Sequence, residues 1–482
     1  MLTPRKIASN TAWYAIALAL QKVISFVYFT ILARFLGPQD IGKYFFATSF
    51  TFLFAVFTDL GMSQVLTRQV ARDKEQGSKL LSQVIVLKIL FSLIIIAAIG
   101  IISPIITADP ITRTLIMIAT GSMLLDGFTM IFYAAIRGQQ NLTYESIATI
   151  IHQAIILSVG GFFIFNQAPV TVIIFSLLAG SIFNFLYSLS MAVKKLGFKI
   201  RFNWDKNLLQ SLLLLMIPFA MAAVFTRIYA YIDTILLNLI KGSEAVGYYS
   251  IAYKITFAFQ FLPLAFVAAL YPAFSHFWQH DKSMLYISLS KALQYLLIIS
   301  LPISAGLATL APWIIPALYT DSFGPAILPL QLLILTLPFL FLNFPLGALL
   351  NAANKQKTQT LIIACGMILN IIINLIFIPL YGPIGAAIAS VSGTLFIFIT
   401  SLIITNKLTP YDAKLIITTA LRAGLITILM VMMMLWLINL LPWYVAVICG
   451  AIFYLLGIVL MKLVRISDIK SLKNCLFYRS VQ

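Results

Sequence analysis

Nine charged side chains occur inside stretches of this sequence that are otherwise apolar enough to lie in lipid. A charge at the bilayer centre costs about 2.5–3.5 kcal/mol on insertion scales, so each requires a partner or a function. Three acids cannot neutralise six cations, and this surplus favours a site that binds an anion. The cations are Lys22, Lys88, Arg227, Lys254, Lys291 and Arg422, and the acids are Asp59, Asp126 and Asp233.

Lys22 and Arg227 carry the sharpest form of this hypothesis because they are separated by 205 residues. The same offset brings residues 37–44 onto residues 242–249, and both octapeptides read G-x-x-x-(I/V)-G-x-Y. Their glycines suit tight turns between helices. An internal repeat with this offset places one cation at the same depth in each half. In a shared cavity, Arg would bind a phosphate through two parallel hydrogen bonds, and Lys would attract it as a point charge.

We therefore predict an anion-binding central cavity. Its substrate-binding residues are predicted to be Lys22, Arg227, Lys254 and Lys291. The acids Asp59, Asp126 and Asp233 are predicted to line the cavity or to couple transport to an ion. The alternative is that these acids neutralise the cations from neighbouring helices. We expect Lys88 and Arg422 to reach towards the membrane surface with their long side chains.

The elements that must position these residues are membrane-spanning helices. The hydrophobic fraction is 61%, the charged fraction is 10% and the mean hydropathy is +1.02, whereas soluble domains carry about 25% charged residues. Runs of about 20 apolar residues can cross a hydrocarbon core of about 30 Å. We predict fourteen spans, at 11–33, 44–66, 81–103, 114–136, 147–165, 169–191, 209–239, 246–272, 286–310, 326–350, 359–378, 383–405, 415–437 and 443–461.

The basic residues predict how these spans are oriented. Of 32 Lys and Arg residues, six lie inside spans, four in connections after odd-numbered spans, and the other 22 at the ends or after even-numbered spans. Cytoplasmic connections carry an excess of Lys and Arg. Both termini are therefore predicted to be cytoplasmic, and the net charge of +18 indicates membrane topology and lipid contacts rather than nucleic-acid binding.

The repeat divides the chain into two parallel six-helix lobes and two extra helices. The predicted parts are an N-lobe at 1–203, a C-lobe at 204–406, and the last two spans with a cytoplasmic tail at 407–482. Parallel repeats are typical of transporters that bind substrate between their halves. Pro338 and Pro345 suggest a bend in the tenth span. The spacing of His276 and His280 offers no third ligand, so no metal and no cofactor are expected.

Several motifs of the sequence resemble bacterial polysaccharide flippases of the multidrug/oligosaccharidyl-lipid/polysaccharide superfamily. The resemblance covers nearly the whole chain, and the motifs that carry it are short. These motifs are Ile31-Leu32-Ala33-Arg34-Phe35-Leu36-Gly37-Pro38-Gln39-Asp40-Ile41-Gly42, Asp59-Leu60-Gly61 with Arg68 and Arg72, Tyr231-Ile232-Asp233 before Gly242, and Tyr381-Gly382-Pro383-Ile384-Gly385-Ala386-Ala387.

The resemblance implies two lobes around a central cavity in a bacterial cytoplasmic membrane. It also implies a transporter, not an enzyme, that moves an oligosaccharide on polyprenyl (pyro)phosphate from the inner to the outer leaflet by alternating access. Lipid-linked oligosaccharide and membrane lipids would be its partners, with a glycan polymerase or glycosyltransferases alongside. A coupling ion, H⁺ or Na⁺, is left open.

Three alternatives are weighed against this function. A cation-coupled multidrug exporter of the same superfamily would favour acids, but the predicted cavity has more cations. A peptidoglycan lipid precursor flippase also has fourteen spans and is not separated by these motifs. A membrane glycosyltransferase or polymerase would require an acidic pair or a large loop, whereas the connections here are short.

Overall fold

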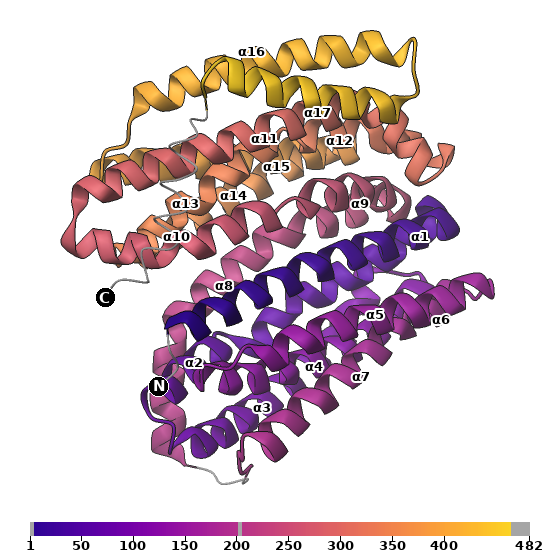
Figure 1. Cartoon of the computed structure of the whole chain (residues 1–482). Coiled ribbons are helices and arrows are strands. Elements are labelled where there is room, and N and C mark those ends of the chain that lie inside the picture. The colour runs from indigo at the N-terminus through magenta and orange to yellow at the C-terminus, as the bar shows by residue number, and fades with distance from the viewer. Residues whose placement is uncertain (1–3, 201–204, 464–482) are drawn as a thin grey trace. The chain divides into compact units, whose positions relative to one another are not determined.

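Helices are the only regular elements in residues 4–200 and 205–463, which are the residues that the computed structural model describes (Figure 1). In lipid every backbone N–H and C=O must be paired within the chain, and a helix pairs them within one segment. The first helices are α1 Pro4–Asp59, α2 Met62–Arg72, α3 Gly77–Ile106, α4 Pro110–Gly138, α5 Thr143–Phe165, α6 Val170–Ile173, α7 Phe175–Ser190, η1 Met191–Lys195, α8 Lys206–Lys241 and α9 Ser243–Ala258. The others are α10 Phe261–His280, α11 Lys282–Leu318, η2 Asp321–Ala326, α12 Ile327–Leu333, α13 Thr336–Ala352, α14 Gln356–Tyr381, α15 Pro383–Leu408, α16 Ala413–Ile438 and α17 Trp443–Leu460.

The predicted all-α membrane architecture is confirmed. Within the described residues, twelve helices are long and apolar enough to cross a membrane, and a bent pair, Asp321–Leu333 with Thr336–Ala352, makes a thirteenth span. One of the twelve, Ile16–Asp59, is 44 residues long, which is about twice the length that one span needs. Gly37 interrupts it with non-helical backbone angles, so it comprises two spans and the fold is consistent with fourteen.

The chain separates into two compact units. The first unit comprises Met1–Ser250 with Ile378–Gly382, and the second comprises Ile251–Phe377 with Pro383–Gln482. Helix α8 thus groups with the first six spans. The predicted boundary between residues 203 and 204 lies outside the described residues, as does the tail beyond Leu463. The predicted division into an N-lobe, a C-lobe and a final pair of spans remains a prediction.

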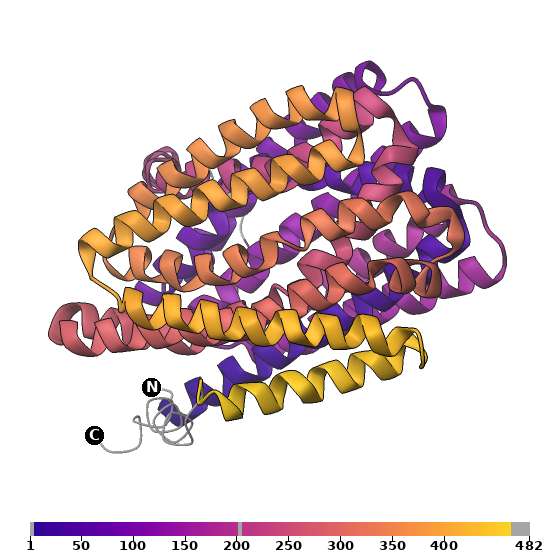
Figure 2. The same ribbon diagram turned by 90° about the horizontal axis from the view of Figure 1, so that it is seen from above.

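Helix α1 is central to the first unit, where it packs against α4, α5 and α8. Helices α4 and α7 and helices α5 and α7 also pack closely. In the second unit, α16 packs on both α11 and α17, and Figure 2 shows α16 and α17 running antiparallel along α11. A buried cluster that includes Ile298, Ile426, Met430 and Tyr454 fills the space between these three helices.

The repeated glycine turns predicted from the sequence are confirmed by the backbone. Gly37 has φ 73° and ψ 177°, and Gly242, which lies 205 residues later, has φ 83° and ψ 179°. This region of backbone angles is essentially restricted to glycine. The two turns therefore share a conformation as well as a sequence pattern.

The two turns also pack against each other inside the first unit. A methyl group placed on Gly42 would meet the carbonyl of Ser243, and one placed on Gly247 would meet the carbonyl of Pro38. The offset of 205 residues converts Pro38 into Ser243 and Gly42 into Gly247, so the contact is reciprocal. We call these four residues the glycine clasp. Glycine allows this close approach of two backbones because it has no side chain.

The predicted bend in the tenth span lies just before Pro338. Helices α12 and α13 meet at an angle of 45°, and the break falls at Ile334–Leu335. In a straight helix the ring of Pro338 would clash with the carbonyl four residues earlier, which is that of Ile334. The Ser304 hydroxyl donates a hydrogen bond of 2.8 Å to this carbonyl. The backbone N–H of Leu337 donates a second hydrogen bond of 3.0 Å to the same carbonyl. The backbone group at the bend is therefore satisfied by α11 and by the local chain together.

Candidate functional site

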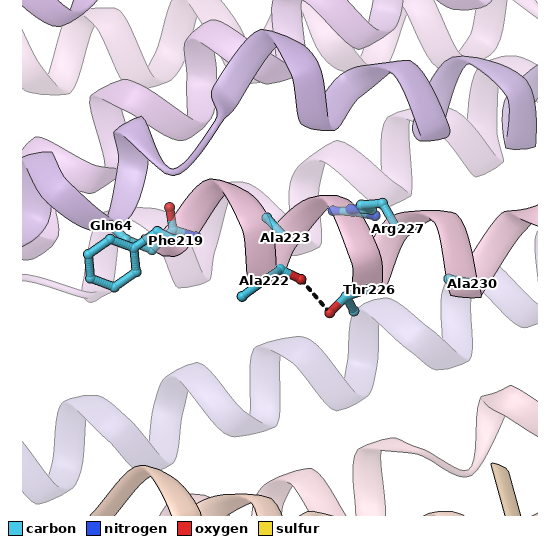
Figure 3. Close-up of a pocket in the computed structure, with 7 residues that line it drawn as sticks. All are labelled: Gln64, Phe219, Ala222, Ala223, Thr226, Arg227 and Ala230. Carbon is cyan, nitrogen blue, oxygen red and sulfur yellow. Dashed lines mark hydrogen bonds between the residues drawn. The ribbon is translucent and has the colours of Figure 1, made fainter. Parts of the chain in front are cut away.

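Arg227 lines a cavity of about 390 Å³ in the first unit (Figure 3). Six of the lining residues lie on α8 with helical spacing, so they share one face of that helix. Three of them are alanines, which leave room around the longer Arg227 side chain. The lining residues are Gln64 of α2 and Phe219, Ala222, Ala223, Thr226, Arg227 and Ala230 of α8.

Arg227 is exposed on α8, and Tyr231 follows it one turn further along the same helix. The Tyr231 hydroxyl interacts with the Arg227 guanidinium, and the Tyr231 ring stacks on Phe52 of α1 with ring centres 5.9 Å apart. This stack restrains the tyrosine beside the cation. Because Tyr231 contacts Arg227 through a single hydroxyl, the other guanidinium N–H groups are available to a ligand.

Lys22 lies on α1 and is also exposed. Helices α1 and α8 pack against each other within the first unit, although Lys22 is not one of the residues that line the Arg227 cavity. Among the described residues, neither cation takes part in any of the ion pairs. The structure thus gives no support to the alternative in which an acid on a neighbouring helix neutralises Lys22 or Arg227.

Lys254 and Lys291 belong to the second unit, on α9 and α11, and both are half-buried. The Lys291 ammonium lies 5.9 Å from the ring centre of Tyr295. The structure therefore groups the four predicted cations as two pairs, one in each unit. The assignment of all four to one anion site remains a prediction.

The three acids have different surroundings within the first unit. Asp59 accepts a hydrogen bond of 2.6 Å from Ser63, and the buried Asp233 accepts one of 2.8 Å from Tyr249. The Oδ1 atom of Asp126 is buried and has no hydrogen-bond partner in the described structure. Ser181 is hydrogen-bonded to the same carboxylate, so Asp126 has one buried oxygen that a proton, a water molecule or an ion could use.

The expectation that Lys88 reaches towards the membrane surface is wrong, because its side chain is completely buried in the first unit. Its ammonium donates a hydrogen bond of 3.0 Å to Thr58 of α1, and Asp59 is the acid whose charge acts on it. On α4, a methyl group placed on Gly127 would lie 2.7 Å from the Lys88 ammonium. Sequence reasoning missed this site because a lone lysine in an apolar run carries no sign of the glycine opposite it.

The close packing of Lys88 against Gly127 can be tested with a double-mutant cycle. We expect Gly127→Ala to lower the melting temperature of the purified protein, because the new methyl group would crowd the buried ammonium. In a Lys88→Ala background the methyl group has room, and the higher helix propensity of Ala should recover up to about 1 kcal/mol. The coupling between the two changes should be about 0.5–3 kcal/mol.

Gly161→Ala in α5 is the matched control, because nothing lies within 4 Å of a methyl group placed there. It should behave alike in both backgrounds. Equal effects of Gly127→Ala with and without Lys88 would contradict the packing described above.

An ion pair holds α1 to the start of α4 next to the glycine clasp. The ammonium of the buried Lys43 lies 3.0 Å from Asp109, which also caps α4 by accepting from the backbone N–H groups of Ile111 and Thr112. Partial burial would by itself raise the pKa of Asp109. Hydrogen bonds from Thr112 and the ammonium of Lys43 outweigh burial and hold this pKa below its ordinary value.

The lowered pKa predicts a pH-dependent stability. An Asp whose pKa is lowered on folding stabilises the fold fully above its unfolded pKa of about 3.9, and this contribution is lost as pH falls through the folded pKa. Asp109→Asn retains a capping side chain but removes the charge. We expect the wild type to be more stable than this variant by about 1 kcal/mol at neutral pH, and the difference to vanish at low pH. A difference in melting temperature that is independent of pH would contradict this role for the charge.

Comparisons with known proteins agree with the fold. The polysaccharide biosynthesis protein family matches residues 7–278, and the MatE family matches residues 218–376. An uncharacterized membrane protein of Methanocaldococcus jannaschii is 24% identical, over 97% of this chain and 98% of its own. The probable low-salt glycan biosynthesis flippase Agl15 of Haloferax volcanii is 20% identical, over 76% of each chain.

Among solved structures, lipid II flippase MurJ in an inward closed conformation has a TM-score of 0.78 and 21% sequence identity, and the similarity covers 94% of this chain and 99% of that one. This likeness confirms the predicted all-α fold class with two lobes. The family match covers more than half of the sequence. The chain therefore belongs to the polysaccharide biosynthesis protein family, and it is a multi-pass membrane transporter of the multidrug/oligosaccharidyl-lipid/polysaccharide superfamily.

Proposed function

We propose that this protein is a flippase that moves a lipid-linked oligosaccharide from the inner to the outer leaflet of the cytoplasmic membrane. The lipid carrier in this proposal is a polyprenyl phosphate or diphosphate. The Haloferax volcanii relative reported above is described as a probable low-salt glycan biosynthesis flippase. We therefore propose lipid-linked glycans as the substrate class, with bacterial repeat units as one member of it.

The observation that carries this proposal is the exposed Arg227 in a cavity of a membrane-spanning helix, without a carboxylate partner among the described residues. A guanidinium at this depth requires compensating negative charge. A phosphate group supplies the charge and accepts two parallel hydrogen bonds from the guanidinium. Lys22, on the adjacent α1, supplies a second cation for the same ligand.

The glycine clasp supplies the closure that alternating access requires. Gly37 and Gly242 follow the first and seventh predicted spans, so with both termini in the cytoplasm the clasp lies on the outer side. Contact between Gly42 and Ser243, and between Gly247 and Pro38, then holds the break in α1 against the turn between α8 and α9. In this proposal the clasp separates when substrate leaves towards the outer leaflet.

Membrane potential helps this direction of movement. Transfer of one negative charge from an inside-negative compartment to the outside is favoured by about 2.3 kcal/mol per 100 mV. Glycosyltransferases that build the glycan would act before the flippase. Enzymes that consume it at the outer leaflet, such as a glycan polymerase, would act after it.

Two other cargoes each have one observation in their favour. The likeness to lipid II flippase MurJ favours a peptidoglycan precursor, which also carries a diphosphate. The match to the MatE family favours multidrug export. The uncompensated cations argue against a cationic drug, because they would repel it.

The function can be tested by reconstituting the full chain in proteoliposomes. Each of three cargoes should be offered separately: a fluorescent lipid-linked oligosaccharide, a lipid II analogue and a cationic dye. We expect the oligosaccharide lipid to cross at a rate that depends on the protein, as measured by protection of its glycan from an external glycosidase. Protein-dependent movement of the dye alone would contradict the proposal, and movement of the lipid II analogue alone would replace the proposed cargo by a peptidoglycan precursor.

A further inference from the structure

A second cavity, of about 590 Å³, lies in the second unit between the last two spans. Its walls combine apolar and cationic side chains. The three leucines are all exposed on the surface of the helix pair, and both cations are exposed as well. The lining residues are Leu421, Arg422 and Leu425 of α16, Leu460 at the end of α17, and Met461 and Lys462 directly after it.

The level of this groove in the membrane follows from the length of α17. This helix has 18 residues, which corresponds to about 27 Å and nearly matches the hydrocarbon core of about 30 Å. Lys462 follows its last turn and therefore lies where headgroups begin. Arg422 lines the same groove although it is nine residues into α16, because α16 continues beyond the end of α17.

Arg422 has no carboxylate partner among the described residues, and neither has Lys462. Asp412, the acid at the start of α16, is engaged in capping through a bond of 2.9 Å from the backbone N–H of Leu415. The two positive charges in the groove are therefore not compensated by this part of the protein. They are exposed on the helix pair together with the leucines.

The position of Lys462 is held from inside the second unit. The buried Gln294 of α11 donates a hydrogen bond of 3.2 Å to the backbone carbonyl of Leu463, and the Leu463 side chain is buried. Close packing of Gly457 against Ile426 fixes α17 on α16 in the same region. The two cations are thus placed by packed elements on both sides of the groove.

We propose that this groove binds an anionic phospholipid of the cytoplasmic leaflet. The phosphate lies between Arg422 and Lys462, and the acyl chains cover Leu421, Leu425 and Leu460. Charge complementarity selects a net negative headgroup, because a zwitterionic lipid would bring its own cation to a groove that already has two. The site is distinct from the proposed cargo site, since its residues belong to other spans than Lys22 and Arg227.

The test uses the purified full chain in detergent after removal of native lipid. Native mass spectrometry would measure binding of phosphatidylglycerol and of phosphatidylcholine to the wild type and to Arg422→Gln, Lys462→Gln and Lys414→Gln. Lys414 is exposed near the start of the same helix and does not line the groove, so its variant loses the same charge elsewhere. Circular dichroism would confirm that each variant retains its helices.

We expect the wild type and Lys414→Gln to bind phosphatidylglycerol in preference to phosphatidylcholine. Each groove variant should weaken phosphatidylglycerol binding about tenfold, as expected for loss of one charge-assisted hydrogen bond. Equal binding by all four proteins would overturn the proposal. Displacement of phosphatidylglycerol from the wild type by an equal concentration of polyprenyl phosphate would also overturn it, because the groove would then belong to the cargo lipid.

Discussion

Gly247→Ala is expected to reduce transport at least tenfold, and Gly42→Ala is expected to do the same. In each variant the added methyl group would collide with a backbone carbonyl, that of Pro38 or Ser243. Backbone atoms cannot move aside as the end of a flexible side chain can. Overpacking of this kind typically costs about 1–3 kcal/mol, and in the proposed mechanism this cost falls on the state in which the clasp is closed.

The effect should be visible as increased access from outside. A cysteine introduced at Ala230, in a background without the native cysteines, would report on the Arg227 cavity through labelling by a membrane-impermeant maleimide. We expect little labelling of the parent protein in right-side-out vesicles and clearly more in either clasp variant. If the clasp variants were labelled no more than the parent protein and transported normally, the clasp would not be the outer closure.

Gly100→Ala in α3 is the matched control for the clasp. It introduces the same methyl group into a helix of the same unit, and nothing lies within 4 Å of that position. This variant should transport normally and resist labelling like the parent. Loss of function in Gly100→Ala would mean that glycine substitution itself, rather than the reciprocal contact, explains the clasp phenotype.

Arg227→Gln is expected to slow transport by about tenfold to a hundredfold, and Lys22→Gln by about tenfold. A hydrogen bond to a charged group contributes about 1.5–3 kcal/mol, which corresponds to factors of this size. Arg227 should have the larger effect because its guanidinium can engage two phosphate oxygens at once. Arg227→Lys should be intermediate, since a lysine restores the charge but not the paired geometry.

The spans and the repeat were predictable because they depend on periodic, local features. Apolar length alone gives helices long enough to cross the membrane, and the offset between the two G-x-x-x-(I/V)-G-x-Y segments predicts that Gly37 and Gly242 have equivalent roles. The structure confirms this in their shared backbone angles. The bend before Pro338 was predictable for the same reason, because a proline acts on the turn that precedes it.

The contacts between distant elements were not predictable from these patterns. Nothing in the sequence indicates that Gly42 contacts Ser243. The offset of 205 residues pairs Gly42 with Gly247 instead, so the repeat alone does not predict this contact. The burial of Lys88 depends on Thr58 and Gly127 from two other helices. A single sequence does not reveal which helices become neighbours, so a buried lysine and one that reaches the surface look alike.

The candidate cation site was only partly predictable from the sequence. The residue type of its cations is given by the sequence, their depth in the membrane stays a prediction, and the exposure of Lys22 and Arg227 agrees with a ligand-facing role. The cavity around Arg227 depends on Phe219, Ala223 and Ala230, whose spacing places them on one face of α8. The small size of the two alanines became informative only when the facing residue, Gln64 of α2, was known.

Transport of a fluorescent lipid-linked oligosaccharide in proteoliposomes tests the central claim most directly. The proteins to compare are the wild type, Arg227→Gln, Lys22→Gln and the control Lys241→Gln, which removes an exposed charge from the end of the same α8 helix. The account predicts that the wild type and Lys241→Gln transport at similar rates, and that both other variants are at least tenfold slower with normal expression and folding. Transport at the wild-type rate by both Arg227→Gln and Lys22→Gln would contradict an anion site built on these two cations.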